Sequence, residues 1–287
     1  MKMKKFFVLA MCAVLAFACV GCGKKDEKKD DKKNEVVNQE NENKEQENKD
    51  DANKEENKDD NKQQENTADV KSEGVMTYAE YMAAEMDTEV VIETYVQAHQ
   101  SWWDNKITVY SQDKDGAYFL YNMACTEEDA KKLVPGTKIK VTGYKGEWSG
   151  EIEVMDATFE IIEGASYIAP VMDVTSLLGT DELIKHQNEF VAFKGMTVEA
   201  AGKDADGNDV PFLYNWDGSG EKGSDLYFNV SLNGTTYTFT VESYLCGSDT
   251  AVYQAVENLK IGDVVDMEGF LYWYEGVNPH ITSVTVK

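Results

Sequence analysis

The C-terminal part of the chain contains one residue pattern twice. The stretch 133–144 aligns without gaps on the stretch 259–270. Both read Leu-x-x-Gly-x-x-apolar-x-apolar-x-Gly-aromatic, where x is any residue. A repeated pattern indicates that one structural unit occurs twice. Any fold assigned to the first copy must therefore also fit the second.

Each copy has a predicted β-hairpin upstream of the shared pattern. Two runs rich in β-branched and aromatic residues flank a dipeptide that suits a tight turn with positive φ. The runs and dipeptides are 107–110, Asp115-Gly116 and 118–121 in the first copy, and 226–230, Asn233-Gly234 and 237–241 in the second.

A short helix is predicted between each hairpin and the shared pattern. It begins at Thr126 in the first copy and at Ser248 in the second, where a hydroxyl cap precedes acidic residues. A short amphipathic segment also leads into each copy, at 77–80 with a capping-box pattern and at 180–184. We expect these lead-in segments to plug one end of each unit.

The remaining predicted strands complete the same order in both copies. One long strand precedes each hairpin and two strands follow each helix. Their ranges are 90–98, 139–144 and 151–162 in the first copy, and 190–200, 264–272 and 281–286 in the second.

This order resembles the OB-fold, a five-stranded Greek-key barrel. The resemblance covers most of residues 85–164 and 185–287, and a small β-sandwich is the competing architecture. We therefore predict a mainly β protein with two tandem OB-fold-like five-stranded barrels, each with a short helix. The expected domains are 74–164 and 165–287, after a disordered linker.

The first residues carry an export pattern. Three lysines in the first five residues precede an uncharged apolar run, which is too short for a membrane span of about 20 residues. The run ends in a sequence that resembles the lipobox of bacterial lipoproteins. This likeness implies a signal peptide over 1–22 and a lipid on Cys22, with Cys19 as the alternative. An uncleaved anchor helix would leave the chain on the same membrane.

Residues 23–73 are rich in Lys, Asp, Glu, Asn and Gln and almost free of apolar side chains. Such a segment cannot bury enough surface to offset the entropy of ordering it, so we predict a disordered linker. As a whole, the chain is similar to the tandem OB-like lipoproteins of anaerobic Gram-positive bacteria. That resemblance implies architecture and a lipid-anchored location outside the cytoplasm, without implying an activity.

The charge of the repeated region argues against polyanionic partners. The chain contains no arginine, and residues 74–287 carry 13 lysines against 35 acidic residues, a formal charge of −22. Nucleic-acid affinity rests mainly on cationic contacts to phosphate. A nucleic-acid partner is therefore unfavoured, although the OB-fold permits a single-stranded nucleic-acid-binding protein as an alternative.

No catalytic pattern stands out. The three histidines are not at metal-ligand spacing, and no nucleophile-elbow, phosphate-loop or zinc-protease motif is present. We expect a binding protein rather than an enzyme, with a cell-envelope hydrolase as the alternative because carboxylates are abundant.

All five tryptophans fall in loops where OB-folds bind ligands. Aromatic rings beside carboxylates suit a neutral glycan, or else a basic surface of a partner protein. Rings that cap the barrel ends or join the domains would be a purely structural alternative. The candidate ligand-binding residues are Trp102, Trp103, Asp104, Trp148, Trp216, Asp217 and Trp273.

Two further groups of residues suggest a metal site and a disulfide bridge. Asp204, Asp206, Asn208 and Asp209 resemble the start of a calcium loop, but an aspartate occupies the usual glycine position. No other cofactor is expected. Cys125 and Cys246 are the only cysteines of the repeated region. They could form one disulfide bridge or remain two buried thiols.

Overall fold

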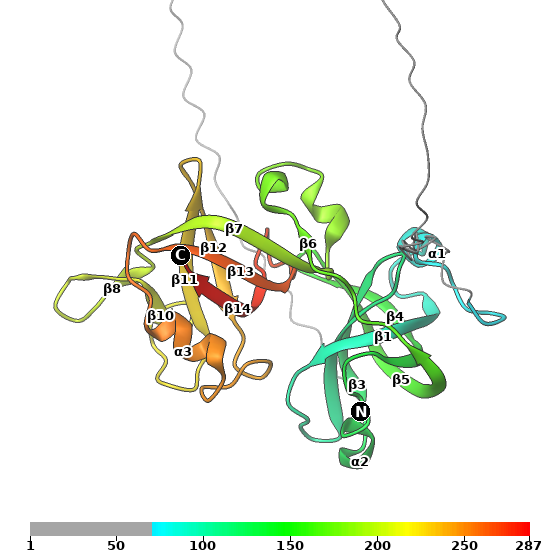
Figure 1. The fold of residues 1–287 in the computed structure, drawn as a ribbon. Helices are drawn as coiled ribbons and strands as arrows, with labels where there is room; N and C mark the ends of the chain where they lie inside the picture. The colour runs from blue at the N-terminus through cyan, green and yellow to red at the C-terminus, as the bar shows by residue number, and fades with distance from the viewer. Residues whose placement is uncertain (1–70) are drawn as a thin grey trace, which may run out of the picture. The chain divides into compact units, whose positions relative to one another are not determined.

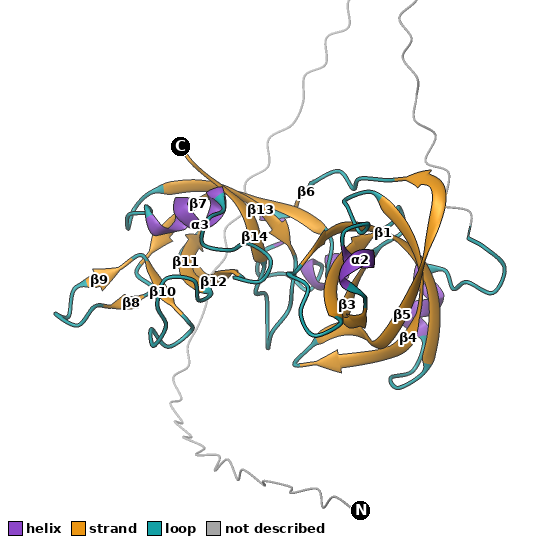
Figure 2. Cartoon of the chain, turned by 90° about the horizontal axis from the view of Figure 1, so that it is seen from below, coloured by secondary structure: helices purple, strands orange, loops and turns teal. Residues whose placement is uncertain are grey.

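The computed structural model describes residues 71–287, which belong to one compact unit. Strands predominate in this part of the chain and its helices are short (Figure 2). The predictions for 1–22 and for most of 23–73 lie outside the described residues. Within 71–287, no helix is long and apolar enough to cross a membrane.

The first copy folds into a closed five-stranded barrel in the order β1-β2-β3-β5-β4 (Figure 1). Its strands are β1 (Glu89–His99), β2 (Lys106–Gln112), β3 (Ala117–Ala124), β4 (Thr137–Trp148) and β5 (Glu151–Ser166). β3 and β5 pair in parallel, whereas the other neighbours are antiparallel. We call this unit barrel 1.

Two short helices accompany barrel 1. α2 (Glu127–Ala130) connects β3 to β4 and is capped by Thr126, as predicted. α1 (Tyr78–Ala83) precedes β1 and begins with the predicted capping box of Thr77 and Glu80. Tyr81 of α1 is buried in the core of barrel 1, so this helix packs against the barrel.

The second copy repeats this topology and forms barrel 2. Its strands are β7 (Phe190–Glu199), β11 (Leu226–Leu232), β12 (Thr235–Val241), β13 (Val264–Phe270) and β14 (His280–Val286). They close in the order β7-β11-β12-β14-β13, with β12 and β14 parallel. α3 (Ala251–Glu257) connects β12 to β13. Two OB-fold-like barrels are thus confirmed, and the competing β-sandwich is wrong because both sheets close.

Short elements fill the connections of barrel 2. β6 (Met172–Asp173), η1 (Thr175–Leu177) and η2 (Leu183–His186) precede β7. The long first loop contains β8 (Gly202–Lys203), β9 (Asp209–Val210) and β10 (Phe212–Tyr214). β10 pairs with β11 and thereby extends the sheet beyond the closed barrel.

The repeated pattern needs glycine at two positions, and the physical reason at each position is the same in both copies. The first, Gly136 or Gly262, has φ of 91° or 93°, which is accessible to glycine without strain. At the second, Gly143 or Gly269, a Cβ would approach a backbone oxygen of the neighbouring strand to 2.8 or 2.2 Å. The first glycine of the pattern therefore permits a turn, and the second permits two strands of the barrel to approach closely.

Of the two predicted positive-φ turns, the one in the second copy is confirmed and the one in the first copy is wrong. Asn233 and Gly234 do have positive φ, at 52° and 83°. Asp115 and Gly116 do not, because the carboxylate of Asp113 accepts both of their backbone N–H groups and holds a different turn. A second correction concerns α3, whose cap is Thr250 rather than Ser248.

The two cysteines of the described region are both free and both buried. Burial raises the pKa of each thiol to about 11. Because the thiolate is the reactive form, both groups are poor nucleophiles at neutral pH. Of the two alternatives raised by the sequence, the structure therefore has two buried thiols.

Aromatic packing and hydrogen bonds join the two barrels. Tyr110 of β2 stacks on Phe270 of β13, with ring centroids 4.6 Å apart. Its hydroxyl lies 2.5 Å from Nδ1 of His280. On the polar side, Oε2 of Glu151 accepts from the backbone N–H of Trp273 at 2.9 Å and from the side chain of Gln187 at 3.2 Å.

Candidate ligand-binding cleft

A cleft of about 850 Å³ lies against the outer face of β11 and β12, and we call it the main cleft. Because side chains alternate along a strand, every second residue of these strands faces the cleft while the residues between fill the barrel core. The residues that line the cleft are Tyr227 and Asn229 of β11, with Asp225 directly before this strand, and Thr238 and Thr240 of β12, with Glu242 directly after it. This is the second-and-third-strand face on which OB-folds bind ligands.

Aromatic side chains from three other segments complete the walls of the main cleft. Trp216 comes from the first loop of barrel 2 and is 76% exposed. Tyr272 and Tyr274 come from the loop between β13 and β14, and Tyr121 comes from β3 of barrel 1. Tyr272 stacks on His280 at 4.2 Å, which fixes its ring in the wall.

Amides and hydroxyls of the main cleft are held in place by one another. Oδ1 of Asn229 accepts from the hydroxyl of Thr238 at 2.8 Å. Oδ1 of Asn278 accepts from the hydroxyl of Thr240 at 2.9 Å. Side chains that are already oriented lose less conformational entropy when a ligand binds them.

Two carboxyl groups also line the main cleft. Oδ1 of Asp225 accepts from the backbone N–H and the hydroxyl of Ser243, at 2.8 and 2.6 Å. Glu242 accepts from the backbone N–H of Leu245 at 2.7 Å. Burial, and then the charge of Asp225, raises the pKa of Glu242 to about 7. Near neutral pH this carboxyl group can therefore either donate or accept a hydrogen bond.

The cleft has no cationic group near neutral pH. Among the described residues that line it, none is a lysine. Its one histidine is His280, and burial lowers the pKa of this ring to about 3. The cleft thus combines aromatic faces with neutral and acidic hydrogen-bonding groups.

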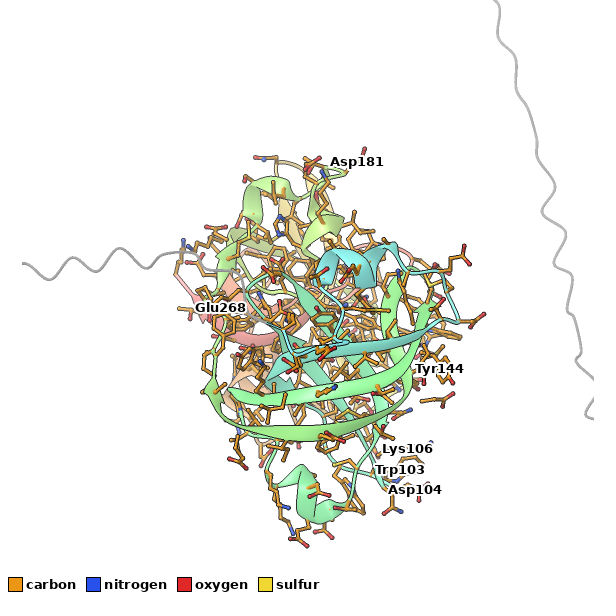
Figure 3. All side chains as sticks on the ribbon, turned by 90° about the vertical axis from the view of Figure 1, so that its right-hand side faces the viewer. Trp103, Asp104, Lys106, Tyr144, Asp181 and Glu268 are labelled. Carbon is orange, nitrogen blue, oxygen red and sulfur yellow. The ribbon has the colours of Figure 1, made fainter. Side chains whose placement is uncertain are left out.

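The structure separates the five tryptophans instead of gathering them. Only Trp216 lines the main cleft. Trp103 is 68% exposed and projects at an edge of barrel 1 together with Asp104 (Figure 3). Trp148 is 61% exposed at the end of β4.

Two tryptophans have structural roles. Trp102 packs against the core of barrel 1 and donates its indole N–H to the backbone oxygen of Cys125 at 2.9 Å. Trp273 packs against the core of barrel 2. Asp217 accepts from the backbone N–H of Ser219 and so supports its own turn. The structure therefore does not bring the predicted ligand residues together at one place.

Sequence reasoning selected loop residues and missed the residues of the strand face. Tyr227 and Asn229 were available as a signal, since they alternate with buried residues along a strand already assigned to a hairpin, and Glu242 directly follows the second strand of that hairpin. Tyr121 could not be found in this way, because it reaches the cleft only through the contact between the barrels.

The four residues of the predicted calcium loop lie in or beside a turn and make hydrogen bonds and an ion pair there. The carboxylate of Asp204 accepts from the backbone N–H groups of Asp206 and Asn208 and from the side chain of Asn208. Asp209 pairs with Lys203 at 2.7 Å. Within residues 71–287, no group of three or more His, Cys, Asp or Glu side chains could hold a metal ion.

Comparisons with known proteins return structural similarities alone. No family model matches the chain, and no curated protein matches it. Solved structures with similarity include the tetrameric p202 HIN2 domain, at 10% identity and a TM-score of 0.29, covering 71% of this chain and 96% of that one. A murine DNA-binding protein bound to double-stranded DNA has 10% identity and a TM-score of 0.32, with coverages of 69% and 96%. The p204 HINb domain has 10% identity and a TM-score of 0.30, with coverages of 68% and 95%.

Proposed function

We propose that this chain is an exported, lipid-tethered binding protein whose main cleft holds a neutral glycan. The observation that carries the proposal is the lining of the cleft, where aromatic rings stand beside amides, hydroxyls and carboxyl groups. Ligand sites are commonly concave, largely apolar and equipped with a few oriented polar groups. A sugar ring offers an apolar C–H face for stacking and hydroxyls around its edge.

The charge distribution supports a neutral ligand over a polyanion. Asp225 and Glu242 face the cleft, and no lysine of the described residues lines it. A single-stranded nucleic acid would bring its phosphates to these carboxyl groups without a compensating cation. Nucleic acid remains the alternative ligand because OB-folds use this strand face for oligonucleotides as well as oligosaccharides.

Truncating Tyr227 tests the proposed site. The full chain is titrated by calorimetry with neutral oligosaccharides of hexoses and of N-acetylhexosamines. Tyr227→Ala is expected to weaken binding by about tenfold or more, which corresponds to roughly 1.4 kcal/mol of lost stacking. Tyr144→Ala is the matched control, because Tyr144 is an exposed tyrosine of β4 that does not line the main cleft.

The same titration separates the alternatives. Equal affinities of wild type and Tyr227→Ala would contradict the site, and no binding of any glycan would contradict the proposal. Binding of a single-stranded oligonucleotide that weakens steeply with salt would favour the nucleic-acid alternative. Saturable binding of a basic protein alone would favour a partner protein.

A hydrolase remains the second alternative, and one observation favours it. Asp225 and Glu242 line the same cleft, and the pKa of Glu242 is raised to about 7. Glycoside hydrolysis uses a pair of carboxyl groups, one of which has a raised pKa and acts as the general acid. Mass spectrometry of each oligosaccharide after the titration would reveal shorter products if the chain cleaves its ligand.

The proposed tether rests on Cys22, outside the described residues. Cells that express the full chain are fed a fatty-acid analogue that can be detected on protein. Cys22→Ala is expected to abolish labelling, whereas Cys19→Ala keeps it as the matched control. The reverse result would move the lipid to Cys19, and labelling of neither wild type nor variant would contradict the tether.

A further inference from the structure

A second, smaller cavity of about 270 Å³ adjoins the main cleft. The two share Gln100 and Tyr121 as lining residues, so they meet at these side chains. We call the smaller cavity the side pocket. Its other walls include two strongly exposed aromatic residues, Trp103 and Tyr244.

The ring of Trp103 is attached to a well-ordered turn. The backbones of Trp103 and Lys106 exchange two hydrogen bonds, at 3.0 and 2.9 Å. The residues between them, Asp104 and Asn105, have φ of 47° and 60°. Positive φ at both central positions is typical of the tight two-residue hairpin turn. The turn thereby holds the backbone of Trp103 in place before any ligand binds.

The side pocket is also anchored across the two barrels. The backbone N–H of Ser101, beside Trp102, donates to the backbone oxygen of Tyr244 at 2.7 Å. The hydroxyl of Ser101 approaches the same oxygen at 3.2 Å. The first loop of barrel 1 and the segment after β12 therefore form one continuous surface, which places Tyr244 beside the turn that carries Trp103.

We propose that the side pocket and the main cleft form one extended groove for a chain of sugar rings, in which Trp103 binds a ring beyond those held in the main cleft. This inference rests on the proposed glycan function and specifies its ligand class as an oligosaccharide. Trp103 and Tyr244 then contribute only when the ligand is long enough to pass Gln100 and Tyr121. A ligand confined to the main cleft contacts neither ring.

The chain itself supplies a matched control for this proposal. Trp148 is as exposed as Trp103 and also belongs to barrel 1, but it lines neither cavity. Both residues lie outside the buried core, so replacing either by alanine is expected to leave the fold intact. Unchanged melting temperatures of the two variants check this point.

The test is a series of neutral β-1,4-linked gluco-oligosaccharides and N-acetylglucosamine oligosaccharides, from dimer to hexamer, titrated into the full chain. Affinity is expected to rise with length. Trp103→Ala is expected to weaken hexamer binding by about tenfold, a loss of roughly 1.4 kcal/mol, and to leave dimer binding unchanged. Trp148→Ala leaves both unchanged.

The possible failures are distinguishable. An affinity that depends on Tyr227 but is equal for all lengths, or is unaffected by Trp103→Ala, overturns the extended groove and leaves the glycan cleft standing. An equal loss at every length places Trp103 in contact with the first rings and also overturns the groove. Absence of binding at every length overturns both proposals.

Discussion

Raising the pH from about 5 to about 9 is expected to lower the free energy of unfolding by several kcal/mol, mainly through Glu151. This side chain is fully buried, and burial raises its pKa to about 8. One carboxyl oxygen accepts from the backbone N–H of Trp273 and from the side chain of Gln187. The protonated form is therefore the one that the folded chain prefers.

The sign of the effect follows from the direction of the shift. The pKa of Glu151 is higher in the folded chain than in the unfolded chain, where it is close to 4.5. Its contribution to stability is complete below the unfolded value and is lost as the pH rises through about 8. For one group this loss is on the order of 3–4 kcal/mol over the window. Glu153, with a pKa raised to about 7 by burial, adds to the same trend.

Urea unfolding at a series of pH values measures this dependence. Glu151→Gln retains an oxygen that accepts from Trp273 and Gln187 but cannot ionise, so a much shallower decline is expected. Glu160→Gln is the matched control, because Glu160 is an exposed glutamate of the same strand, β5. Two results would contradict the prediction that ionisation of Glu151 lowers stability. One is a wild-type stability that does not fall over this range, and the other is a Glu151→Gln decline as steep as that of wild type.

Replacing Tyr110 by alanine is expected to destabilise the chain by about 3–5 kcal/mol, as for other large buried aromatic residues. The Tyr110 ring is fully buried among rings of both barrels, 4.6 Å from Phe270 and 5.1 Å from Phe119. Alanine would leave a cavity in this contact. It would also remove the hydroxyl that lies beside Nδ1 of the buried His280 ring.

Tyr110→Phe separates the two contributions. The ring contacts remain, so the expected loss falls to about 1–3 kcal/mol, the cost of a buried polar atom without its partner. Tyr144→Phe is the control, since its hydroxyl belongs to an exposed side chain. Urea unfolding gives all three values. A loss below about 1 kcal/mol for Tyr110→Ala would show that the aromatic contact contributes little to joining the barrels.

The repeated fold could be predicted because its signals are local. The glycines at 136 and 262 mark a positive-φ turn, and runs of β-branched and aromatic residues around a turn dipeptide mark each hairpin. Two local predictions were wrong because a nearby side chain made hydrogen bonds that the pattern did not indicate. Asp113 reorganised the turn at 115–116, and Thr250 displaced Ser248 as the cap of α3.

The candidate site could be predicted only in part. Sequence placed Trp102, Trp216 and Trp273 in the right loops, but loop position does not determine which way a ring turns. The Trp102 ring packs inward, where its indole N–H donates a hydrogen bond to the backbone oxygen of Cys125. Likewise, the main cleft depends on residues distant in sequence, such as Tyr121 and Glu242, that meet only after both barrels pack together.

The central claim is that ligand binds in the main cleft, and fluorine NMR of the full chain labelled with 5-fluorotryptophan tests it most directly. Single Trp→Phe variants assign the five resonances. On addition of the tightest-binding oligosaccharide, the resonance of Trp216 is expected to shift, while those of Trp102 and Trp148 stay in place. Saturable binding that shifts Trp148 and leaves Trp216 unchanged would contradict the account.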